Sequence, residues 1–167
     1  MARINITKDS NIIVTGSNGQ LGLAFYEKMK FLNNAHFLDK KTLDITNKKN
    51  ISDVFKQYNP DILINTAAYT NVDKAESERE QALLINAKSL NFLTELCAKS
   101  NSLLIHFSTD YVFDGQKSDS YTETDKTNPI NYYGKTKLLG EEIISHSDCR
   151  YLIFRISWCA FLQYEQL

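Results

Sequence analysis

The sequence predicts an α/β fold, in which a doubly wound parallel sheet lies between two helical layers. Two observations support this expectation. Short, wholly apolar segments alternate with longer amphipathic ones, and small or polar residues follow the short segments. Strands that are apolar on both sides are typical of parallel sheets buried between helices. Right-handed crossovers then favour the strand order 3-2-1-4-5, and we expect one domain over residues 1–167.

The expected elements follow from the spacing of the apolar residues. In the first amphipathic segment, Leu21, Phe25 and Met29 fall on one helical face. Asn59-Pro60 closes the second expected helix, since a proline disfavours helical backbone in the residue before it. We expect strands at 12–14, 36–38, 61–64, 103–107 and 151–155, helices at 20–32, 50–58, about 78–100 and 131–144, and a loop at 115–128.

The composition, with 43% hydrophobic and 23% charged residues, is that of a soluble globular protein. A net charge of -1 argues against nucleic acid as a partner, because phosphate binding usually needs a basic excess. The sequence contains no run of eighteen apolar residues, so no membrane span is predicted. Cys97, Cys149 and Cys159 form no CxxC pair, which argues against a disulfide framework or a metal site and favours the cytoplasm. We expect His106 and His146 to be structural or solvated.

A turn at residues 16–22 follows the first expected strand and has glycine at every third position: Gly16, Gly19 and Gly22. The first glycine allows a tight turn, and the second lets backbone N–H groups approach a pyrophosphate. The third lets the following helix pack closely on the strand. Asp39 closes the second strand about 20 residues later, where a carboxylate can accept a hydrogen bond from a ribose hydroxyl. The sequence therefore predicts a Rossmann-like domain that binds NAD or NADP.

The residues after the second expected strand leave the cofactor preference open. Asp39 would repel the 2′-phosphate of NADPH and so favours NADH. Lys40 and Lys41 follow immediately and could pair with that phosphate. We therefore predict NADPH or NADH as the cofactor.

Tyr133 and Lys137 lie one helical turn apart and share a helix face. An ammonium group beside a phenol lowers the pKa of the phenol, which can then deliver a proton to a carbonyl oxygen. Tyr26 and Lys30 have the same spacing, so spacing alone proves nothing. Thr109 distinguishes the later pair, because it ends the fourth expected strand and that strand leads to the helix of Tyr133. These three groups would converge as a hydride-transfer site requires.

Several sequence strings together identify a resemblance. The glycine pattern with Tyr133-x-x-x-Lys137 resembles the extended short-chain dehydrogenases/reductases, and further strings resemble their dTDP-4-dehydrorhamnose reductase family. These strings are GQLG (19–22), NTAAYT (65–70), VDKAE (72–76), STDYVFDG (108–115), YGKTK (133–137) with the following Gly140-Glu141, and Arg155-x-Ser157-Trp158. The resemblance extends from about residue 10 to 158.

The resemblance implies a reaction and roles for the catalytic groups. The reaction is NAD(P)H-dependent reduction of the 4-keto group of a dTDP-6-deoxy-hexulose, which gives dTDP-L-rhamnose. Tyr133 would donate the proton, Lys137 would support it and bind the nicotinamide ribose, and Thr109 would orient the carbonyl.

The resemblance also implies binding residues. Gly19, Gln20 and Leu21 would contact the pyrophosphate, within the turn formed by Gly16 and Gly22. The other implied cofactor contacts are Asp39, Asp44, Ile45, Ala67, Ala68, Tyr69 and Thr70. The implied contacts of the nucleotide-sugar substrate are Thr109, Asp110, Tyr111 and Trp158. From the residues alone, Asp44 could equally be a helix cap or turn residue, and Trp158 a core aromatic.

The C-terminus departs from the resembled family. Its members continue well past Trp158 into a smaller lobe that holds the nucleotide part of the substrate, whereas residue 167 is the last one here. We therefore expect a C-terminally shortened chain that retains dinucleotide binding and has weak or no turnover. An unfinished sheet edge beside the fifth strand could favour a homodimer.

Two other functions compete with simple reduction. A dehydratase or epimerase of the same fold would need a second carboxylate after the threonine, and here Asp110 is followed by Tyr111. A non-catalytic NAD(P)-binding partner subunit is the other alternative. It would not be expected to retain Thr109, Tyr133 and Lys137 together.

Overall fold

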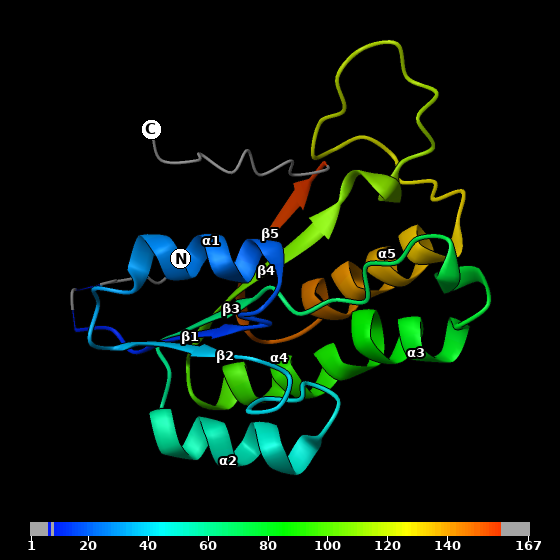
Figure 1. The fold of residues 1–167 in the computed structure, drawn as a ribbon. Coiled ribbons are helices and arrows are strands. Elements are labelled where there is room, and N and C mark those ends of the chain that lie inside the picture. The colour runs from blue at the N-terminus through cyan, green and yellow to red at the C-terminus, as the bar shows by residue number, and fades with distance from the viewer. Residues whose placement is uncertain (1–6, 8, 158–167) are drawn as a thin grey trace, which may run out of the picture.

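A parallel sheet with helices on both faces forms the centre of the molecule (Figure 1). The computed structural model describes residues 7 and 9–157. Within them the sheet has five strands, all parallel, in the order β2-β1-β3-β4-β5. The strands are β1 (Ile12–Thr15), β2 (Ala35–Leu38), β3 (Ile62–Asn65), β4 (Leu103–Thr109) and β5 (Arg150–Ile156). The predicted fold class is confirmed.

The helices occupy the connections that the sequence predicts. They are α1 (Gln20–Met29), α2 (Lys48–Tyr58), α3 (Arg79–Leu83), α4 (Ser89–Lys99) and α5 (Tyr132–Ser145). A π-helical turn, Leu84–Lys88, joins α3 to α4, so the expected helix at about 78–100 is one continuous helical path. The segment 115–128 contains no helix or strand and projects away from the sheet, as Figure 1 shows. No helix in the described part of the chain has the length and apolar character needed to cross a membrane.

The core consists of two apolar clusters, one on each face of the sheet. Ile13 and Leu63 belong to the cluster that packs against α2, α4 and α5. Val14 and Ile64 point the other way, where Phe25 of α1 covers them. Adjacent residues of β1 and β3 therefore serve opposite faces, because side chains alternate along a strand. The uniformly apolar strands follow from this double coverage.

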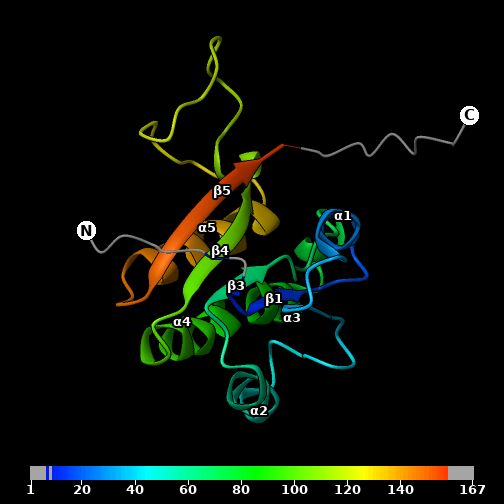
Figure 2. The same ribbon diagram turned by 90° about the vertical axis from the view of Figure 1, so that its left-hand side faces the viewer.

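The predicted strand order 3-2-1-4-5 is wrong, because β3 lies beside β1 on the side opposite β2. Because crossovers are right-handed, the face of the sheet on which a connecting helix lies determines on which side of the first strand the next strand is added. Since α1 and α2 cover opposite faces, the chain moves across the sheet in one direction from β1 to β2 and in the opposite direction from β2 to β3 (Figure 1, Figure 2). The predicted order would have required both helices on one face.

This topology opens a crevice where the functional residues lie. The connections that leave β1 and β3 go to opposite faces of the sheet, through α1 and through α3 and α4 respectively. Adjacent parallel strands with diverging connections leave a gap at their carboxyl ends, which is where open α/β sheets bind ligands.

Close contact between α5 and the π-helical turn sets the position of α5 over the sheet. Gly140 faces this turn, and a Cβ atom there would collide with the Asn86 carbonyl oxygen and approach Leu90 Cδ1 to 2.8 Å. At its other end α5 is capped by Asn131, whose side chain accepts a hydrogen bond from the Gly134 N–H at 2.7 Å. Both contacts help to fix where Tyr133 and Lys137 lie.

We predict that Gly140→Ala lowers the free energy of unfolding by about 1–3 kcal/mol, although alanine is the better helix former. The added methyl group meets backbone, which cannot rotate away, so α5 must shift. Urea unfolding followed by circular dichroism measures the change. Glu142→Ala, at an exposed position of the same helix, is the control and should stay within about 0.5 kcal/mol of the parent. Equal stability of both variants would contradict the packing argument.

Candidate active site

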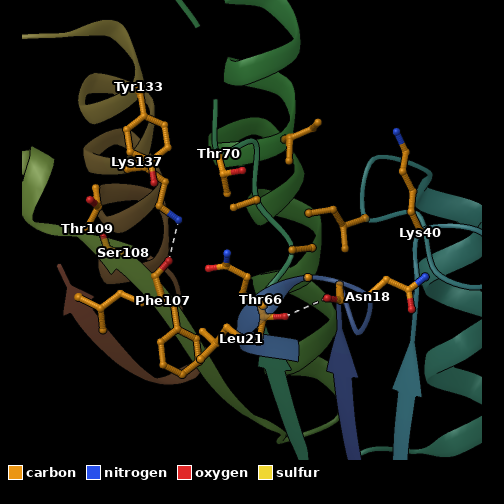
Figure 3. A pocket seen from close by; sticks show the side chains of 18 of the residues that line it. Asn18, Leu21, Lys40, Thr66, Thr70, Phe107, Ser108, Thr109, Tyr133 and Lys137 are labelled. Atoms are coloured by element: carbon orange, nitrogen blue, oxygen red, sulfur yellow. Dashed lines mark hydrogen bonds between the residues drawn. The ribbon is translucent and has the colours of Figure 1, made fainter. Parts of the chain in front are cut away.

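A cleft of about 1210 Å³ opens at the carboxyl ends of the strands, between the β1–α1 turn and α5 (Figure 3). Most of the predicted site residues line it: Gly16, Gly19, Gln20, Leu21, Asp39, Asp44, Ile45, Ala67, Ala68, Thr70, Thr109, Asp110, Tyr111, Tyr133 and Lys137. Gly22 and Tyr69 do not line it. Trp158 lies outside the described residues.

The glycine turn brings the backbone of β1 and α1 to the edge of the cleft. Gly16 has a φ of 64°, and a Cβ atom there would lie 2.8 Å from the Ala67 nitrogen. Gly22 faces inward, where a Cβ atom would collide with the Gly16 carbonyl oxygen and Ser17. Its place in the glycine pattern therefore reflects packing of α1 against the turn, as the sequence argument assumed for the third glycine.

The N-terminus of α1 has no capping side chain. Gly19 is the N-cap residue and offers no side-chain hydrogen bond, whereas Asn47 and Asn131 cap α2 and α5. The first N–H groups of a helix need an acceptor, and the positive end of the helix dipole favours an anion. Since Gly19, Gln20 and Leu21 line the cleft, this end of α1 fits a pyrophosphate.

Asp39 and Lys40 bring opposite charges to the β2 end of the cleft. The Asp39 carboxylate accepts hydrogen bonds from the Thr42 N–H at 3.0 Å and from Asn18 Nδ2 at 3.2 Å. The bonds from Thr42, followed by that from Asn18, hold the pKa of Asp39 below its ordinary value. An ionised carboxylate next to a lysine is compatible with the ribose hydroxyl of NADH and with the 2′-phosphate of NADPH. The cofactor preference therefore stays open, as the sequence indicated.

Asp44 forms a turn and also lines the cleft. Its Oδ1 accepts from the Thr46 N–H at 2.9 Å and from Thr46 Oγ1 at 2.7 Å. Partial burial works against ionisation, but these two bonds outweigh it and lower the pKa of Asp44. The turn role, which the sequence left as the alternative, is thus present. The neighbouring Ile45 offers an apolar surface to the cleft.

The segment after β3 is anchored by Asn86 of the π-helical turn. Asn86 accepts a hydrogen bond from the Tyr69 N–H at 2.8 Å and donates one to the Tyr69 carbonyl at 3.0 Å. Ala67, Ala68 and Thr70 are held against the cleft. The Tyr69 hydroxyl instead donates to Glu78 at 2.7 Å. The structure therefore brings the neighbours of Tyr69, and not Tyr69 itself, to the site.

Tyr133 and Thr109 meet at the end of β4. The Thr109 hydroxyl lies near enough to the Tyr133 phenol to affect its pKa, and it donates to Asp110 Oδ1 at 3.1 Å and accepts from the Tyr111 N–H at 3.2 Å. The Tyr111 ring meets the Tyr133 ring edge-on, with centroids 5.7 Å apart. Burial raises the pKa of Tyr133 and outweighs the lowering by Thr109. The expected lowering of the pKa by Lys137 is wrong for this structure.

Lys137 extends from α5 down to β4 and is only 2% exposed. Its Nζ donates to the Phe107 carbonyl at 2.6 Å, drawn as a dashed line in Figure 3, and lies 3.5 Å from His106 Nε2. Burial lowers the pKa of Lys137 to about 8, although Glu141 on the next turn opposes the shift. The lysine therefore changes charge close to neutral pH.

The structure adds Ser108 to the residues that the sequence argument assigned. Its side chain is 4% exposed, it lines the cleft, and its Oγ has no hydrogen-bond partner among the described residues. A buried hydroxyl without a partner is costly unless a ligand or water supplies one. The adjacent hydroxyl residues Ser108 and Thr109 could have indicated this side chain, but the sequence argument assigned a role to Thr109 alone. Asn18, Phe107 and Ile156 also line the cleft.

The described part of the chain holds no group of three or more His, Cys, Asp or Glu side chains that could bind a metal ion. The polar groups of the cleft instead match a dinucleotide. These groups are the uncapped helix end, the ionised Asp39 and the unpartnered Ser108 hydroxyl.

A comparison with protein families finds a match over residues 10–165 to the family described as the RmlD substrate-binding domain. The chain belongs to this family. Among curated members, it is 39% identical to the dTDP-4-dehydrorhamnose reductase of Aggregatibacter actinomycetemcomitans over 153 residues, 89% of this chain and 51% of that protein. It is 40% identical to the enzyme of the same name from Escherichia coli K12 over 152 residues, again 89% and 51%. The chain thus spans about half the length of these relatives.

Solved structures give the same relationship. The chain is similar to the dTDP-4-dehydrorhamnose reductase of Bacillus anthracis in complex with NADP, with a TM-score of 0.85 and 39% identity over 89% of this chain and 53% of that one. UDP-glucose 4-epimerase of Brucella ovis, in complex with NAD, is only 20% identical but reaches a TM-score of 0.79 over 87% and 51%. That second likeness shows a shared fold.

We predict that the burial of Lys137 makes stability depend on pH. The unfolded chain keeps the lysine proton up to about pH 10.5, whereas the folded chain releases it near pH 8. Between these values the unfolded state binds more protons, so the free energy of unfolding rises with pH, by at most about 1.4 kcal/mol per unit. Urea unfolding at several pH values should show this rise in the parent relative to Lys137→Met. The exposed Lys135→Met control should keep the parent slope, and a parent slope equal to that of Lys137→Met would contradict the assignment.

Proposed function

We propose that this chain binds NADPH or NADH and that Thr109, Tyr133 and Lys137 catalyse reduction of the 4-keto group of a dTDP-6-deoxy-hexulose, which gives dTDP-L-rhamnose. One observation carries the proposal: these three side chains line the same cleft as the uncapped N-terminus of α1. The names of the relatives, and the NADP in one of their structures, support the substrate and the cofactor.

In the proposed reaction the nicotinamide supplies a hydride to the carbonyl carbon when it is bound. The Tyr133 phenol gives its proton to the carbonyl oxygen, which completes the alcohol, and the phenolate then regains a proton from solvent. The raised pKa of Tyr133 supports this direction, since it keeps the phenol protonated before the transfer. The Thr109 hydroxyl, which lies beside the phenol in the same cleft, orients the carbonyl for the transfer.

The binding roles are proposed residue by residue. Gly19, Gln20 and Leu21 would donate to the pyrophosphate, Asp39 would bind the adenosine ribose, and Asp44 and Ile45 would flank the adenine. Ala67, Ala68 and Thr70 would line the cofactor, with Ser108 as an added polar contact. Asp110, Tyr111 and Trp158 would meet the nucleotide sugar. For Tyr69 we propose a role through its backbone, which Asn86 holds.

Location, assembly and domain extent stay predictions. We propose a cytoplasmic protein in which residues 1–167 form one cofactor-binding domain. Leu152 and Phe154 on β5 are 43% and 47% exposed, which supports a homodimer through this apolar face and can be checked by light scattering. The chain spans about half the length of its relatives, so the binding of the nucleotide sugar by this chain alone is part of the proposal.

Of the alternatives, a dehydratase lacks support in the cleft. The carboxylates that line it are Asp39, Asp44 and Asp110, and the first two belong to the opposite end, near β2. The residue after Asp110 is Tyr111, so elimination would lack its second acid–base group.

We predict that Tyr133→Phe reduces the rate of NADPH oxidation with dTDP-4-keto-6-deoxy-L-mannose by at least about 100-fold, because the proton donor is lost. The affinity for NADPH should be unchanged in calorimetric titration. Tyr132→Phe is the matched control on the same helix, and its ring packs against Arg79 and does not line the cleft. Tight NADPH binding without turnover in the parent would favour the non-catalytic subunit. Equal rates for parent and Tyr133→Phe would refute the assigned donor.

We predict that the charges beside β2 set the cofactor preference. Asp39→Asn should raise the affinity for NADPH relative to NADH by roughly tenfold, about 1.4 kcal/mol, because it removes repulsion of the 2′-phosphate. Lys40→Ala should shift the ratio the opposite way. Calorimetric titration with both cofactors measures the ratio, with the exposed Lys56→Ala on α2 as the control. An unchanged ratio in both variants would place the adenosine ribose elsewhere.

A further inference from the structure

The N–H groups in the first turn of α5 find acceptors outside the helix. The first N–H groups of any helix lack a carbonyl partner within it. Asn131, which directly precedes α5, accepts a hydrogen bond from the Gly134 N–H at 2.7 Å. The Tyr132 N–H, the first of the helix, donates instead to Glu76 Oε1 at 2.7 Å. Glu76 lies 56 residues earlier in the chain, at the end of the 3₁₀ turn Lys74–Glu76.

Arg79 holds the Glu76 carboxylate in the position that this bond requires. Arg79 Nη2 lies 3.1 Å from Glu76 Oε2, and Arg79 Nε donates to the Glu76 carbonyl at 3.1 Å. The guanidinium also lies over the Tyr132 ring, with Cζ 4.9 Å from the ring centroid. Each carboxylate oxygen therefore has its own partner, since Oε1 accepts from α5 and Oε2 accepts from an arginine that packs on α5. We call Glu76, Arg79 and Tyr132 the clasp.

The clasp is built on the segment that forms the cleft wall after β3. Residues 67–72 follow β3, and most of them line the cleft. Ala75, next to Glu76, is fully buried, and its N–H donates to the Asn71 carbonyl at 3.0 Å. Asn71 Oδ1 also accepts from the Lys74 N–H at 2.9 Å. Glu76 therefore projects from a firmly packed support, and the clasp connects this wall to the helix of Tyr133.

A second segment, the 3₁₀ turn Asp110–Val112 after β4, contacts the same turn of α5. Gly134 allows this contact, because a Cβ atom there would collide with the Tyr111 carbonyl oxygen. The Tyr111 ring meets the Tyr133 ring edge-on, with centroids 5.7 Å apart. The start of α5 is thus fixed by contacts with two separate segments. A displacement of this start would move the Tyr133 phenol relative to Thr109.

We propose that Glu76 is a positioning residue: by accepting the first N–H of α5, its carboxylate sets where the Tyr133 hydroxyl lies beside Thr109. Glu76 itself does not line the cleft, so it acts through the helix and not on the substrate. A displacement of about 1 Å at a reacting group can cost on the order of 100-fold in rate. This role rests on the proposed function, in which Tyr133 gives the proton.

The charge of Glu76 suits its place at the start of α5. The hydrogen bond from the Tyr132 N–H, followed by that from Arg79, holds the pKa of Glu76 below its ordinary value, so the carboxylate is ionised at neutral pH. A negative charge at a helix N-terminus is favourable because of the helix dipole. The start of α1, by contrast, has no side-chain cap and opens into the cleft. The two helix starts thus differ, since α1 is available to an anionic ligand and α5 already holds an anionic side chain of the protein.

Glu76→Ala tests the positioning role in the NADPH oxidation assay. We expect kcat to fall by about tenfold or more, while the KM for the nucleotide sugar and the affinity for NADPH change by less than about twofold. Glu76→Gln keeps an oxygen that can accept from the Tyr132 N–H and should recover most of the lost rate. Glu80→Ala, which removes an exposed carboxylate on α3, is the control and should keep the parent kcat.

The rates are compared at a temperature at which circular dichroism shows every variant to be fully folded. An effect on stability alone would then leave kcat unchanged in Glu76→Ala, and that result would overturn the proposal. An equal loss of kcat in Glu76→Ala and Glu76→Gln would also overturn it, because the hydrogen bond would not be the cause.

A second measurement needs no turnover. Nuclear Overhauser effects between the ring protons of Tyr111 and Tyr133 report where the phenol lies, and Tyr133→Phe assigns the signals. We expect the effect in the parent and in Glu80→Ala, and we expect it to be reduced or lost in Glu76→Ala. A parent that binds NADPH without turnover would count against the proposed function alone. An unchanged effect in Glu76→Ala would count against this inference alone.

Discussion

The contact of α5 with β4 is the constraint on which the site depends. It buries Lys137 almost completely, and a buried amino group needs hydrogen-bond partners, which Phe107 and His106 supply at the strand end. The helix can approach this closely because Gly140 has no side chain to meet the Asn86 carbonyl. The same Asn86 holds Tyr69 and so the segment after β3. One asparagine thus couples the position of α5 to the wall of the cleft that faces it.

The winding of the sheet supplies the second half of the site. Because α1 and α2 cover opposite faces, β1 lies between β2 and β3, and the turn at Gly16 meets the backbone of Ala67. The uncapped end of α1 therefore opens into the cleft that Lys137 and Tyr133 reach from α5. A sheet in the order 3-2-1-4-5 would have placed β2 between β1 and β3, and the turn at Gly16 would then not have met the segment after β3.

How far the sequence could predict this molecule depends on whether a feature is local. The strands, the glycine turn and the helix of Tyr133 follow from local spacing, and the structure has them within a few residues. The strand order depends on which face α2 covers, and the apolar stripe of α2 fits either face. His106 and Ser108 were not assigned because the importance of each comes from burial and from partners on other elements. Tyr69 was assigned from its string, yet its hydroxyl turns to Glu78.

The protonation of Tyr133 shows why proximity in sequence did not predict the chemistry. A lysine one turn away was expected to lower the pKa of the phenol, but the lysine head points down to β4 and bonds the Phe107 carbonyl. Burial then dominates and raises the pKa of Tyr133. For a group that must give a proton away this is the useful state, because the phenol enters the reaction protonated. Support by Lys137 becomes necessary only once the phenolate has formed. With a pKa of about 8, the lysine can then carry the positive charge that stabilises the phenolate.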